Sequence, residues 1–391
     1  MRSLTGRFVQ DSGRELQKNT FLYKARFTSL IMALIELDGS HGEGGGAILR
    51  QGLALSIASG RGFRIRNIRK NRKNPGLAPQ HLAAVNAAKD LCNAEVKGHF
   101  IGSTELSFKP GEVRPGRYKI DIGTAGSATL LLQSLLLPSI FSGKKISFHI
   151  IGGTDVKWSQ PFDYFKFVFL PQMNRYAEVE ANLFNRGYYP RGGGEIRVGL
   201  KGRQGSNDSD GDSNDERLSV LLMERKSLLQ IRGVSHASRD LEKAGVAERQ
   251  AKSAEMMLDE FQAPVNIKIE YSNALCTGSG ITLWAVFGDE EIDFQNPIIL
   301  GGDCLGERGK KAEVVGKEAA ESLAGVIKSR AATDHFLADQ MIPFMAFTSG
   351  LLSTNKVTRH SESNIYVAEK FLGSRFSVKD NIISCEKNND G

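Results

Sequence analysis

Four glycines within a run of five residues mark the part of the sequence with the clearest potential for chemistry. They lie in DGSHGEGGGAILRQG (residues 38–52), which places Glu43 inside the glycine run and Arg50 just beyond it. An apolar stretch before the run predicts a strand, and apolar residues at helical spacing after it predict a helix. A strand, a glycine turn and a helix leave backbone N–H groups free to bind an anion. Because glycine mainly indicates unusual backbone angles, a tight structural turn is an equally supported interpretation.

A second stretch, RGFRIRNIRKNRK (residues 61–73), contains seven basic residues and no acidic one. Two of its arginines, Arg69 and Arg72, lie three positions apart, and arginine binds phosphate oxygens in bidentate fashion. Such a stretch is either a phosphate-backbone site or a solvated surface, and its composition does not decide between them. Gln80 and His81 follow at the start of the next predicted helix. We expect His81 to bind or cap there rather than act as a base, because a helix N-terminus disfavours a protonated ring.

Polar side chains interrupt two otherwise apolar predicted helices. Gln133 lies among leucines in GTAGSATLLLQ, and a buried glutamine needs a hydrogen-bond partner, which a ligand could supply. Asp339 and Gln340 follow Phe336 in FLADQ, where the carboxylate predicts either a buried ion pair or a site residue. His360 is expected in a turn before a helix, where an isolated histidine is most often plain surface. The seven histidines show no spacing typical of a zinc site.

The order of predicted elements repeats along the chain. A first unit starts with a strand at residues 34–37 and the glycine turn, and a second starts with a strand at 118–122 and the turn GTAGSA (residues 123–128). Both units are predicted as βαβαββ, that is, a strand, a helix, a strand, a helix and two strands. Two such copies indicate tandem repeats rather than one doubly wound sheet, and the predicted fold class is α+β.

The sequence predicts five segments. Residues 1–31 form an N-terminal extension without a strong helix or strand pattern, interpreted as disordered or as the product of an upstream start codon, with a transit peptide as the alternative. Residues 32–204 hold the first two repeats of a large domain, and the acidic, glycine- and serine-containing residues 205–216 form a linker. Residues 217–331 form a smaller α+β domain. Residues 332–391 lack enough elements to fold alone, so they are predicted to complete a third repeat, which makes the smaller domain an insertion.

The composition excludes several classes of protein. The chain has 391 residues, of which 40% are hydrophobic and 24% charged, as is typical of a globular protein with a substantial core. No apolar run approaches the roughly 20 residues that span a bilayer, so no membrane association is expected. The four cysteines are widely separated, which argues against a disulfide framework and is typical of a reducing compartment. The net charge of +7 is by itself weak evidence for nucleic-acid binding.

Seven motifs together resemble the RNA 3′-terminal phosphate cyclase family in their order and spacing. They are LDGSHGEGGGAILR, IRKNRKNPGLAPQHL, GTAGSATLLLQ, the GGT of residues 152–154, GYYPRGGG, LADQ and the turn around His360. The resemblance covers essentially residues 33–387 and implies a large domain of three βαβαββ repeats with a small inserted domain. The presence of both GEGGG and His360 favours the catalytic branch. The alternative is a non-catalytic cyclase-like protein of ribosome assembly, a branch that lacks both features.

The resemblance implies an enzyme of the ligase class that uses ATP and a divalent metal, Mg²⁺ or Mn²⁺, to convert an RNA 3′-phosphate into a 2′,3′-cyclic phosphodiester. By motif position, His360 corresponds to the nucleophile that becomes adenylylated. The residues that correspond to the nucleotide site are Gln133, Phe336, Asp339 and Gln340. Those that correspond to the substrate phosphate and the cleft are Glu43, Arg50, Arg69, Arg72, Gln80 and His81. The metal ligand is left open between Glu43 and Asp339.

Further expectations follow from the resemblance. The partner is an RNA with a 3′-phosphate end, no DNA is expected as the main substrate, and the oligomeric state is left open. The nucleus is the expected location, with an organellar address in residues 1–31 as the alternative. Ala47 and Phe336 stand where the family usually has glutamine and tyrosine. A phenylalanine can stack on adenine but lacks the hydroxyl, so we expect this departure to affect nucleotide affinity more than activity.

Overall fold

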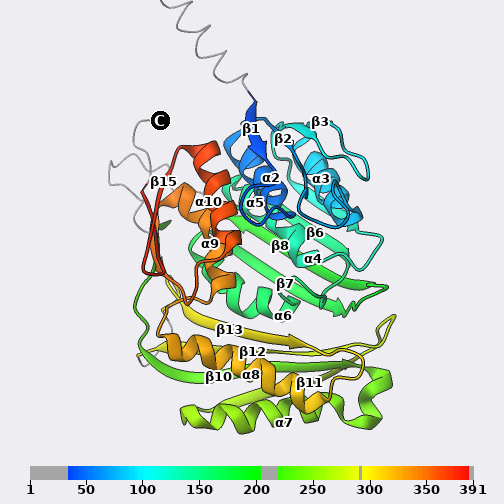
Figure 1. Ribbon diagram of the computed structural model, residues 1–391, viewed down its shortest axis with the longest axis vertical. Helices are drawn as coiled ribbons and strands as arrows, with labels where there is room; N and C mark the ends of the chain where they lie inside the picture. Colours follow the sequence, from blue (N-terminus) through cyan, green and yellow to red (C-terminus); the bar gives the residue numbers. More distant parts are fainter. Residues whose placement is uncertain (1–33, 204–217, 290–292, 387–391) are drawn as a thin grey trace, which may run out of the picture.

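A computed structural model describes residues 34–203, 218–289 and 293–386 (Figure 1). The predicted N-terminal extension (residues 1–31) and the predicted linker (residues 205–216) lie outside the described residues. Within those residues the chain forms four-stranded sheets, and three of the sheets share one strand order. The fold therefore has the predicted α+β class and the predicted repeated units.

The first repeat sets the pattern that the others follow. Its first two strands are parallel, and its last two pair antiparallel beyond them, in the order β1-β2-β4-β3. Its elements are β1 (Ile35–Asp38), α2 (Ala47–Ser59), β2 (Phe63–Arg66), α3 (Pro79–Cys92), β3 (Glu95–Lys97) and β4 (Leu106–Lys109). Residues along β1, β2 and β4 alternate between buried and more exposed, so the sheet has one face on the core and one toward solvent.

The second repeat has the corresponding strand order, β5-β6-β8-β7. Its strands are β5 (Gly116–Asp121), β6 (Lys145–Gly152), β7 (Ala177–Asn185) and β8 (Gly194–Gly202). Its second helical segment consists of α6 (Phe162–Tyr164), the π-helical η1 (Phe165–Phe169) and the 3₁₀-helical η2 (Leu170–Arg175). The glycine-rich GYYPRGGG segment connects β7 to β8 as a hairpin.

The first helix of the second repeat is not continuous, although the predicted βαβαββ order has a single helix at this position. It is divided into α4 (Ala128–Gln133) and α5 (Leu136–Phe141). The division precedes Pro138, which has no N–H to donate to the carbonyl group four residues earlier, that of Ser134. The proline therefore ends the regular helical ladder at the place where the sequence pattern continues.

The third repeat is built from segments on both sides of the small domain. β9 (Val220–Leu222) pairs in parallel with β14 (Gly350–Ser353). The helices are α9 (His335–Thr348) and α10 (Arg359–Leu372), and the sheet is completed by β16 (Ile382–Glu386) and β15 (Arg375–Lys379). From β9 onward the strand order is that of the first two repeats. β9 lies within residues 217–331, the range predicted for the small domain, but its strand partner belongs to the third sheet.

The small domain lies between β9 and α9. Its sheet has the order β11-β10-β12-β13, and α7 and α8 pack together against it (Figure 1). Its elements are β10 (Ser227–Ser238), η4 (Arg239–Ala244), α7 (Val246–Leu258), η5 (Asp259–Phe261), β11 (Val265–Ser272), β12 (Ser279–Gly288), β13 (Ile298–Leu305) and α8 (Ala312–Ser329). The sequence pattern does not predict β13, because Gly301 and Gly302 interrupt its apolar run. A β-carbon at either glycine would collide with Tyr164 or with Leu323 of α8, so the close packing requires them.

The helices of the repeats form the interior of the large domain. α10 packs against α2 and α9, and α2 also packs against α3 and α5. Figure 1 shows α2, α9 and α10 together in the middle of the large domain, with the small domain below them. Most residues of α2 and α9 are buried, which explains why both helices are apolar on nearly every side. A polar side chain within them must therefore find a protein or ligand partner.

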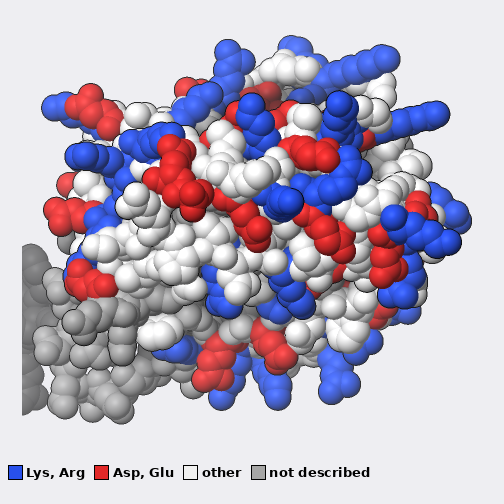
Figure 2. Space-filling model, turned by 90° about the horizontal axis from the view of Figure 1, so that it is seen from below, with Lys and Arg blue, Asp and Glu red and all other residues white. Residues whose placement is uncertain are grey.

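The outer face of the small domain carries mixed charge. Figure 2, which views the molecule from the side of α7, shows basic and acidic side chains interspersed. Arg249 on α7 pairs with Glu313 on α8 at 2.8 Å, and Lys328 pairs with Glu260 at the same distance. Such a face lacks the single-signed field that an extended nucleic-acid backbone contact uses. Among the described residues, no helix is long and apolar enough to cross a membrane.

Leu53 tests the packing of the helical interior. Its side chain in α2 is fully buried, whereas that of Leu221 in β9 is 57% exposed. Leu53→Ala is expected to lower the free energy of unfolding by about 2–5 kcal/mol, because it removes apolar contacts and leaves a cavity. Leu221→Ala makes the same chemical change and should cost far less. Urea unfolding followed by circular dichroism measures both, and equal losses would contradict this account of the core.

Candidate active site at the junction of the three repeats

Polar side chains pack closely against the glycine turn. Gly44 adopts a positive φ of 65°, which a side chain would strain. A β-carbon on Gly45 would collide with the carboxylate of Glu43, and one on Gly46 would collide with the ring of His81. The glycines therefore let these side chains approach the backbone. The anion-binding role of the turn stays a prediction.

Arg50 lies where the first two repeats meet. Its Nε donates a hydrogen bond to Oε1 of Gln133 on α4 (3.3 Å), so the lone glutamine of that apolar helix has a protein partner. Burial lowers the pKa of Arg50 to about 10, which leaves the guanidinium charged at neutral pH. A small cavity beside it is lined by Arg50, Gln80, His81, Ala84, Ser127, Leu130 and Leu131. A positive charge thus faces a small space formed by α2, α3 and α4.

Gln80 and His81 begin α3 next to this cavity. Oε1 of Gln80 accepts a hydrogen bond from the backbone N–H of Ser127 (3.3 Å), which ties the start of α3 to the start of α4. Burial lowers the pKa of His81 to about 3, and three nearby positive charges act in the same direction, those of Arg50, Arg69 and Arg72. Nδ1 of His81 is buried without a hydrogen-bond partner. His81 is therefore a neutral ring at neutral pH, with one nitrogen free for a ligand.

Arg69 and Arg72 lie on the loop between β2 and α3. Nη1 of Arg69 donates to the backbone carbonyl of Gly76 (2.7 Å), and the residue adopts a positive φ of 54°. Arg72 forms an ion pair with Glu43 of the glycine turn. Oε2 of Glu43 is buried and has no hydrogen-bond partner. The loop and the glycine turn therefore bring two guanidinium groups and one carboxylate together.

His360 is the second residue of α10, which corrects the prediction of a turn before a helix. Oγ1 of Thr358 accepts hydrogen bonds from the backbone N–H groups of His360 (3.0 Å) and Ser361 (3.1 Å). Oγ of Ser361 in turn accepts from the backbone N–H of Thr358 (3.0 Å). This capping box starts the helix at Arg359, one residue before His360.

The charges of the first repeat act on His360. Loss of hydration is the largest cause that lowers its pKa, and nearby positive charges act in the same direction, those of Arg50, Arg72 and His335. The side chain is nevertheless exposed to solvent. A lowered pKa keeps the imidazole neutral at pH 7, the form that has a free lone pair for attack.

Asp339 joins α9 to the start of α10. Oγ1 of Thr358 lies 3.0 and 2.9 Å from its two carboxylate oxygens, and Oγ of Ser361 donates to Oδ1 (2.5 Å). Burial raises the pKa of Asp339 to about 7 even though both hydroxyl groups favour its charged form. Among the described residues Asp339 forms no ion pair. Of the two roles predicted for this carboxylate, the buried ion pair is therefore absent there.

Phe336 and Gln340 lie one helical turn apart on α9. Nε2 of Gln340 donates to the backbone carbonyl of Phe336 (3.1 Å), and Phe336 packs edge-on against Tyr164 with ring centroids 6.1 Å apart. In the described part of the chain, no hydrogen bond joins Gln133 to Phe336, Asp339 or Gln340. The residues predicted to bind the nucleotide therefore form two groups, one on α4 and one on α9.

His335 is a cleft residue that the sequence analysis missed. It begins α9 directly before Phe336, and its charge acts on His360. Its own pKa is lowered chiefly by burial. The signal available in the sequence was its position beside the LADQ motif, but a histidine between Asp334 and Phe336 has no distinctive spacing.

Sequence comparison identifies the family. A sequence profile described as RNA 3′-terminal phosphate cyclase matches residues 41–378 of the chain. The chain belongs to the RNA 3′-terminal phosphate cyclase family. It is 46% identical over 353 residues to a protein of that name from Thermococcus kodakarensis, covering 90% of this chain and 96% of the relative. For proteins of the same name the identity is 46% over 353 residues in Archaeoglobus fulgidus (90% and 99% covered) and 43% over 350 residues in Pyrococcus furiosus (89% and 96% covered).

Family membership confirms the resemblance drawn from the seven motifs. The matched residues include the glycine turn, the basic loop, α9 and the start of α10, which carry most of the candidate site residues described above. The relatives named above are archaeal, so they give no support to the predicted nuclear location, which stays a prediction.

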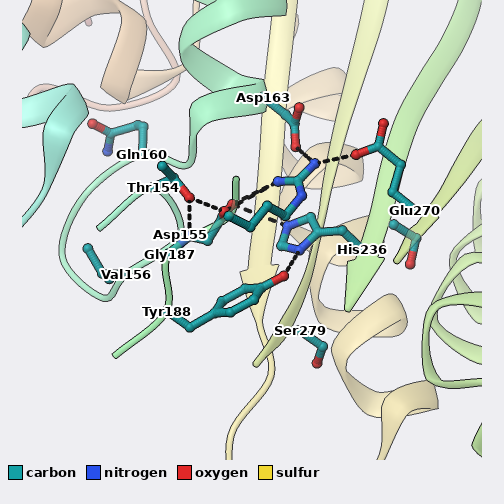
Figure 3. Close-up of polar contacts among 12 residues, drawn as sticks. Thr154, Asp155, Val156, Gln160, Asp163, Gly187, Tyr188, His236, Glu270 and Ser279 are labelled. Atoms are coloured by element: carbon teal, nitrogen blue, oxygen red, sulfur yellow. Dashed lines mark hydrogen bonds and ion pairs between the residues drawn. The ribbon is translucent and has the colours of Figure 1, made fainter. Parts of the chain in front are cut away.

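Beside this cleft, the cyclase-family fold contains a buried ion network that the sequence analysis missed (Figure 3). The fully buried Arg186 contacts Asp155 at 3.2 Å, Asp163 at 2.8 Å and Glu270 of β11 at 2.8 Å. His236 of β10 lies 3.2 Å from Asp155. Burial alone would lower the pKa of Arg186, but the carboxylates of Asp163 and Asp155 raise it well above its ordinary value. The network joins the second repeat to the small domain.

The same network offers ligand atoms for a metal ion but does not fit one. One ligand atom from each of Asp155, Asp163 and His236 lies within 4.8 Å of the others. The guanidinium of Arg186 already contacts both carboxylates, so a cation there would meet a fixed positive charge. Of the two residues predicted as metal ligands, Glu43 keeps one buried oxygen without a hydrogen-bond partner, although Arg72 pairs with its other oxygen, whereas both oxygens of Asp339 lie near hydroxyl groups.

Asp339 makes the stability of this cyclase-family protein depend on pH. Its pKa is about 7 in the folded state against an ordinary value of 3.8, so the folded state holds the proton more tightly than the unfolded state. The contribution of Asp339 to the free energy of unfolding therefore falls by up to about 4 kcal/mol as pH rises from about 4 to 7, while His81, whose pKa is lowered to about 3, contributes in the opposite direction. Asp339→Asn should remove that contribution, measured by urea unfolding at several pH values.

The difference between Asp339→Asn and wild type gives the contribution of Asp339 alone to the pH dependence of stability. Burial also raises the pKa of Asp303 to about 7, so part of the dependence should remain in the variant. Asp90→Asn, a matched change of an exposed carboxylate on α3, should leave the wild-type profile unaltered. A profile of equal slope in Asp339→Asn and wild type would show that Asp339 does not titrate in this range.

Proposed function

We propose that the protein converts an RNA 3′-terminal phosphate into a 2′,3′-cyclic phosphodiester at the expense of ATP, with His360 as the residue that carries the adenylyl group. The observation that carries the proposal is the position of a histidine on a fixed helix start, exposed to solvent and close enough to the arginines of the first repeat for their charges to lower its pKa. Two of the charges that lower its pKa, those of Arg50 and Arg72, come from the repeat farthest away in sequence.

The local structure suits His360 to nucleophilic attack. The capping hydrogen bonds of Thr358 and Ser361 fix the backbone that carries the ring, and the lowered pKa keeps a nitrogen lone pair available at neutral pH. Attack on the α-phosphorus of ATP forms a nitrogen–phosphorus bond and breaks the bond to the bridging oxygen, and pyrophosphate leaves. Asp339, with its pKa near 7, lies one side chain away from the helix start and holds it in place through Thr358.

Two further transfers complete the proposed reaction. An oxygen of the RNA 3′-phosphate attacks the adenylyl phosphorus, and the bond to His360 breaks. The neighbouring 2′-hydroxyl then attacks the 3′-phosphorus, loses its proton and displaces AMP. This last step joins groups of one nucleotide, so it gains chiefly from positioning. The need for a 2′-hydroxyl makes RNA rather than DNA the substrate.

The cleft residues have distinct parts in this proposal. Arg50, Arg69 and Arg72 hold phosphate oxygens and offset the negative charge that develops during transfer. Gln80 and His81, which line the same cavity as Arg50, would contact the same phosphate groups. The nucleotide is assigned to Gln133 and to three residues of α9, namely Phe336, Asp339 and Gln340.

A divalent cation, Mg²⁺ or Mn²⁺, would neutralise part of the triphosphate charge when bound. Glu43 is the residue that would hold it, because its Oε2 is buried without a hydrogen-bond partner. In the present structure Arg72 pairs with the same carboxylate. Glu43 therefore orients Arg72 whether or not it also binds a cation.

Self-labelling tests the proposed role of His360. Incubation with α-labelled ATP and Mg²⁺ should leave label on the protein that is labile in acid and stable in base, as a phosphoramidate is. His360→Ala should abolish the label, while His99→Ala, the matched change of a histidine outside the cleft, should retain it. A wild-type protein that takes no label would refute the proposal and favour a non-catalytic role in ribosome assembly.

Arg69 tests the separation of the nucleotide from the RNA phosphate. Arg69→Ala should impair cyclisation of a 3′-phosphorylated RNA by at least ten-fold more than it impairs self-labelling, since the loss of one charged contact costs on the order of 1.5–3 kcal/mol. Rates of both reactions, measured on the same preparation, give this ratio. Equal losses would assign Arg69 to the nucleotide instead.

A further inference from the structure

Two aromatic side chains of the second repeat are largely exposed to solvent. Trp158 is 93% exposed and Tyr189 is 77% exposed. Large apolar side chains are normally buried in part, because burial stabilises the fold. We call the two rings, together with the turns at residues 156–159 and 188–192 that carry them, the aromatic ledge.

The two turns lie side by side. Asp155 and Tyr188 form a parallel β-bridge just before the turns begin, and Tyr188 and Gly192 form an antiparallel bridge across the second turn. The backbone N–H groups of Thr154 and Asp155 both donate to the carbonyl of Gly187 (2.9 and 3.2 Å). Trp158 and Tyr189 therefore project from the ends of neighbouring turns.

The ion network described above holds this ledge rigidly (Figure 3). Asp155, next to the first turn, contacts Arg186 and lies 3.2 Å from His236. Tyr188, inside the second turn, shares a hydrogen bond of 2.8 Å with Nδ1 of His236. Thr154 contacts both Asp155 and Gly187. The residues that precede the exposed rings are thus fixed in the interior, which lowers the entropy lost when a partner binds the rings.

The aromatic ledge lies next to the segment that lines the cavity beside Arg50. The backbone N–H of Gly153 donates to the carbonyl of Gly126 (2.8 Å), and a β-carbon on Gly192 would contact Ala125. Oγ1 of Thr129 on α4 donates to the carbonyl of Gln160, just beyond the Trp158 turn (2.8 Å). Because Ser127 of this segment is bonded to Gln80, only a few residues separate the ledge from the cavity beside Arg50.

The conformation of Trp158 is unfavourable in itself. Its φ is 64°, a left-handed value that is rare for a large side chain, and its ring makes no aromatic contact within the described residues. Burial does not compensate for the backbone strain, because the ring is in solvent. Neither packing nor secondary structure explains a tryptophan at this position, which points to a partner outside the chain.

We propose that the aromatic ledge binds the nucleotides that precede the RNA 3′ end, with their bases stacked on Trp158 and Tyr189. The inference rests on the proposed function and adds that the substrate end is single-stranded. Stacking on aromatic rings tolerates any base sequence, since every base has a flat face. Arg191, at the tip of the second turn, is exposed and forms no ion pair in the described part of the chain, so it can contact a phosphate of the same strand.

Intrinsic fluorescence reports on the ledge directly. The chain has two tryptophans, and the other, Trp284, is buried against Phe167 with ring centroids 4.4 Å apart. Titration of His360→Ala, which blocks turnover, with a short single-stranded RNA bearing a 3′-phosphate should quench the fluorescence of Trp158. The double variant His360→Ala, Trp158→Phe should lose the quenching but keep its RNA affinity, measured by anisotropy of labelled RNA.

Removal of the rings tests their contribution to binding. In the His360→Ala background, Trp158→Ala and Tyr189→Ala should each weaken binding of the RNA by roughly five-fold to one hundred-fold, because one stacked base is lost. Phe294→Ala is the matched control: its ring is 69% exposed in the connection between β12 and β13, at the opposite end of β12 from Gly278, which packs against Tyr188. It should bind RNA as the parent does.

The remaining outcomes separate this inference from the proposed function. Unchanged RNA affinity in both alanine variants would contradict base stacking on the aromatic ledge. Quenching of Trp158 by ATP alone would contradict it as well, because that result would assign the ring to the nucleotide. A single nucleotide with a 3′-phosphate is too short to reach the rings and should not quench. If wild type fails to self-label but RNA still quenches Trp158, the proposed reaction fails and the RNA surface stands. If wild type self-labels but RNA does not quench Trp158, RNA binding at the aromatic ledge is contradicted and the proposed reaction stands.

Discussion

The hydrogen bonds that Asp339 accepts from Thr358 and Ser361 determine the geometry of the cleft. Thr358 also caps α10, so one hydroxyl group satisfies a buried carboxylate and sets the residue at which the helix begins. That choice fixes His360 on the first turn of a helix instead of in a loop. Among the described residues Asp339 has no cationic partner, and burial raises its pKa to about 7. The backbone that carries His360 is thereby held at the helix start, and the charges of Arg50 and Arg72 in the first repeat act on its ring.

The repeats could be predicted from the sequence because each begins with a local signal, a strand followed by a turn of small residues. The strands that were missed lack such a signal. β9 has only three residues and is a strand because it pairs with β14, which follows the whole small domain in the sequence. β13 contains two glycines that allow close packing but have low strand propensity. Tertiary contacts, not local preference, define these elements, and a pattern read along one chain does not contain them.

The site was predictable in its residue types and less so in its partners. A glutamine within an apolar helix indicated an obligatory hydrogen bond, and the structure supplies Arg50 for Gln133. Asp339 forms hydrogen bonds with two hydroxyl groups rather than an ion pair. The spacing of Thr358 and Ser361 is that of a helix cap, and it does not reveal that their hydroxyl groups also bind a carboxylate on α9. The network around Arg186 draws on four separate segments, so only the folded chain brings it together.

The place of the small domain also affects how the chain folds. In the first repeat a short glycine turn joins the first strand to the first helix, whereas in the third repeat an entire domain stands at that position. The two ends of this domain meet, since Arg225 donates a hydrogen bond to the carbonyl of Ile327. Once folded, it therefore acts on the third repeat as a short connection, with little loop-closure entropy left to lose. During synthesis β9 emerges long before β14, so the third sheet, and with it the start of α10, forms last.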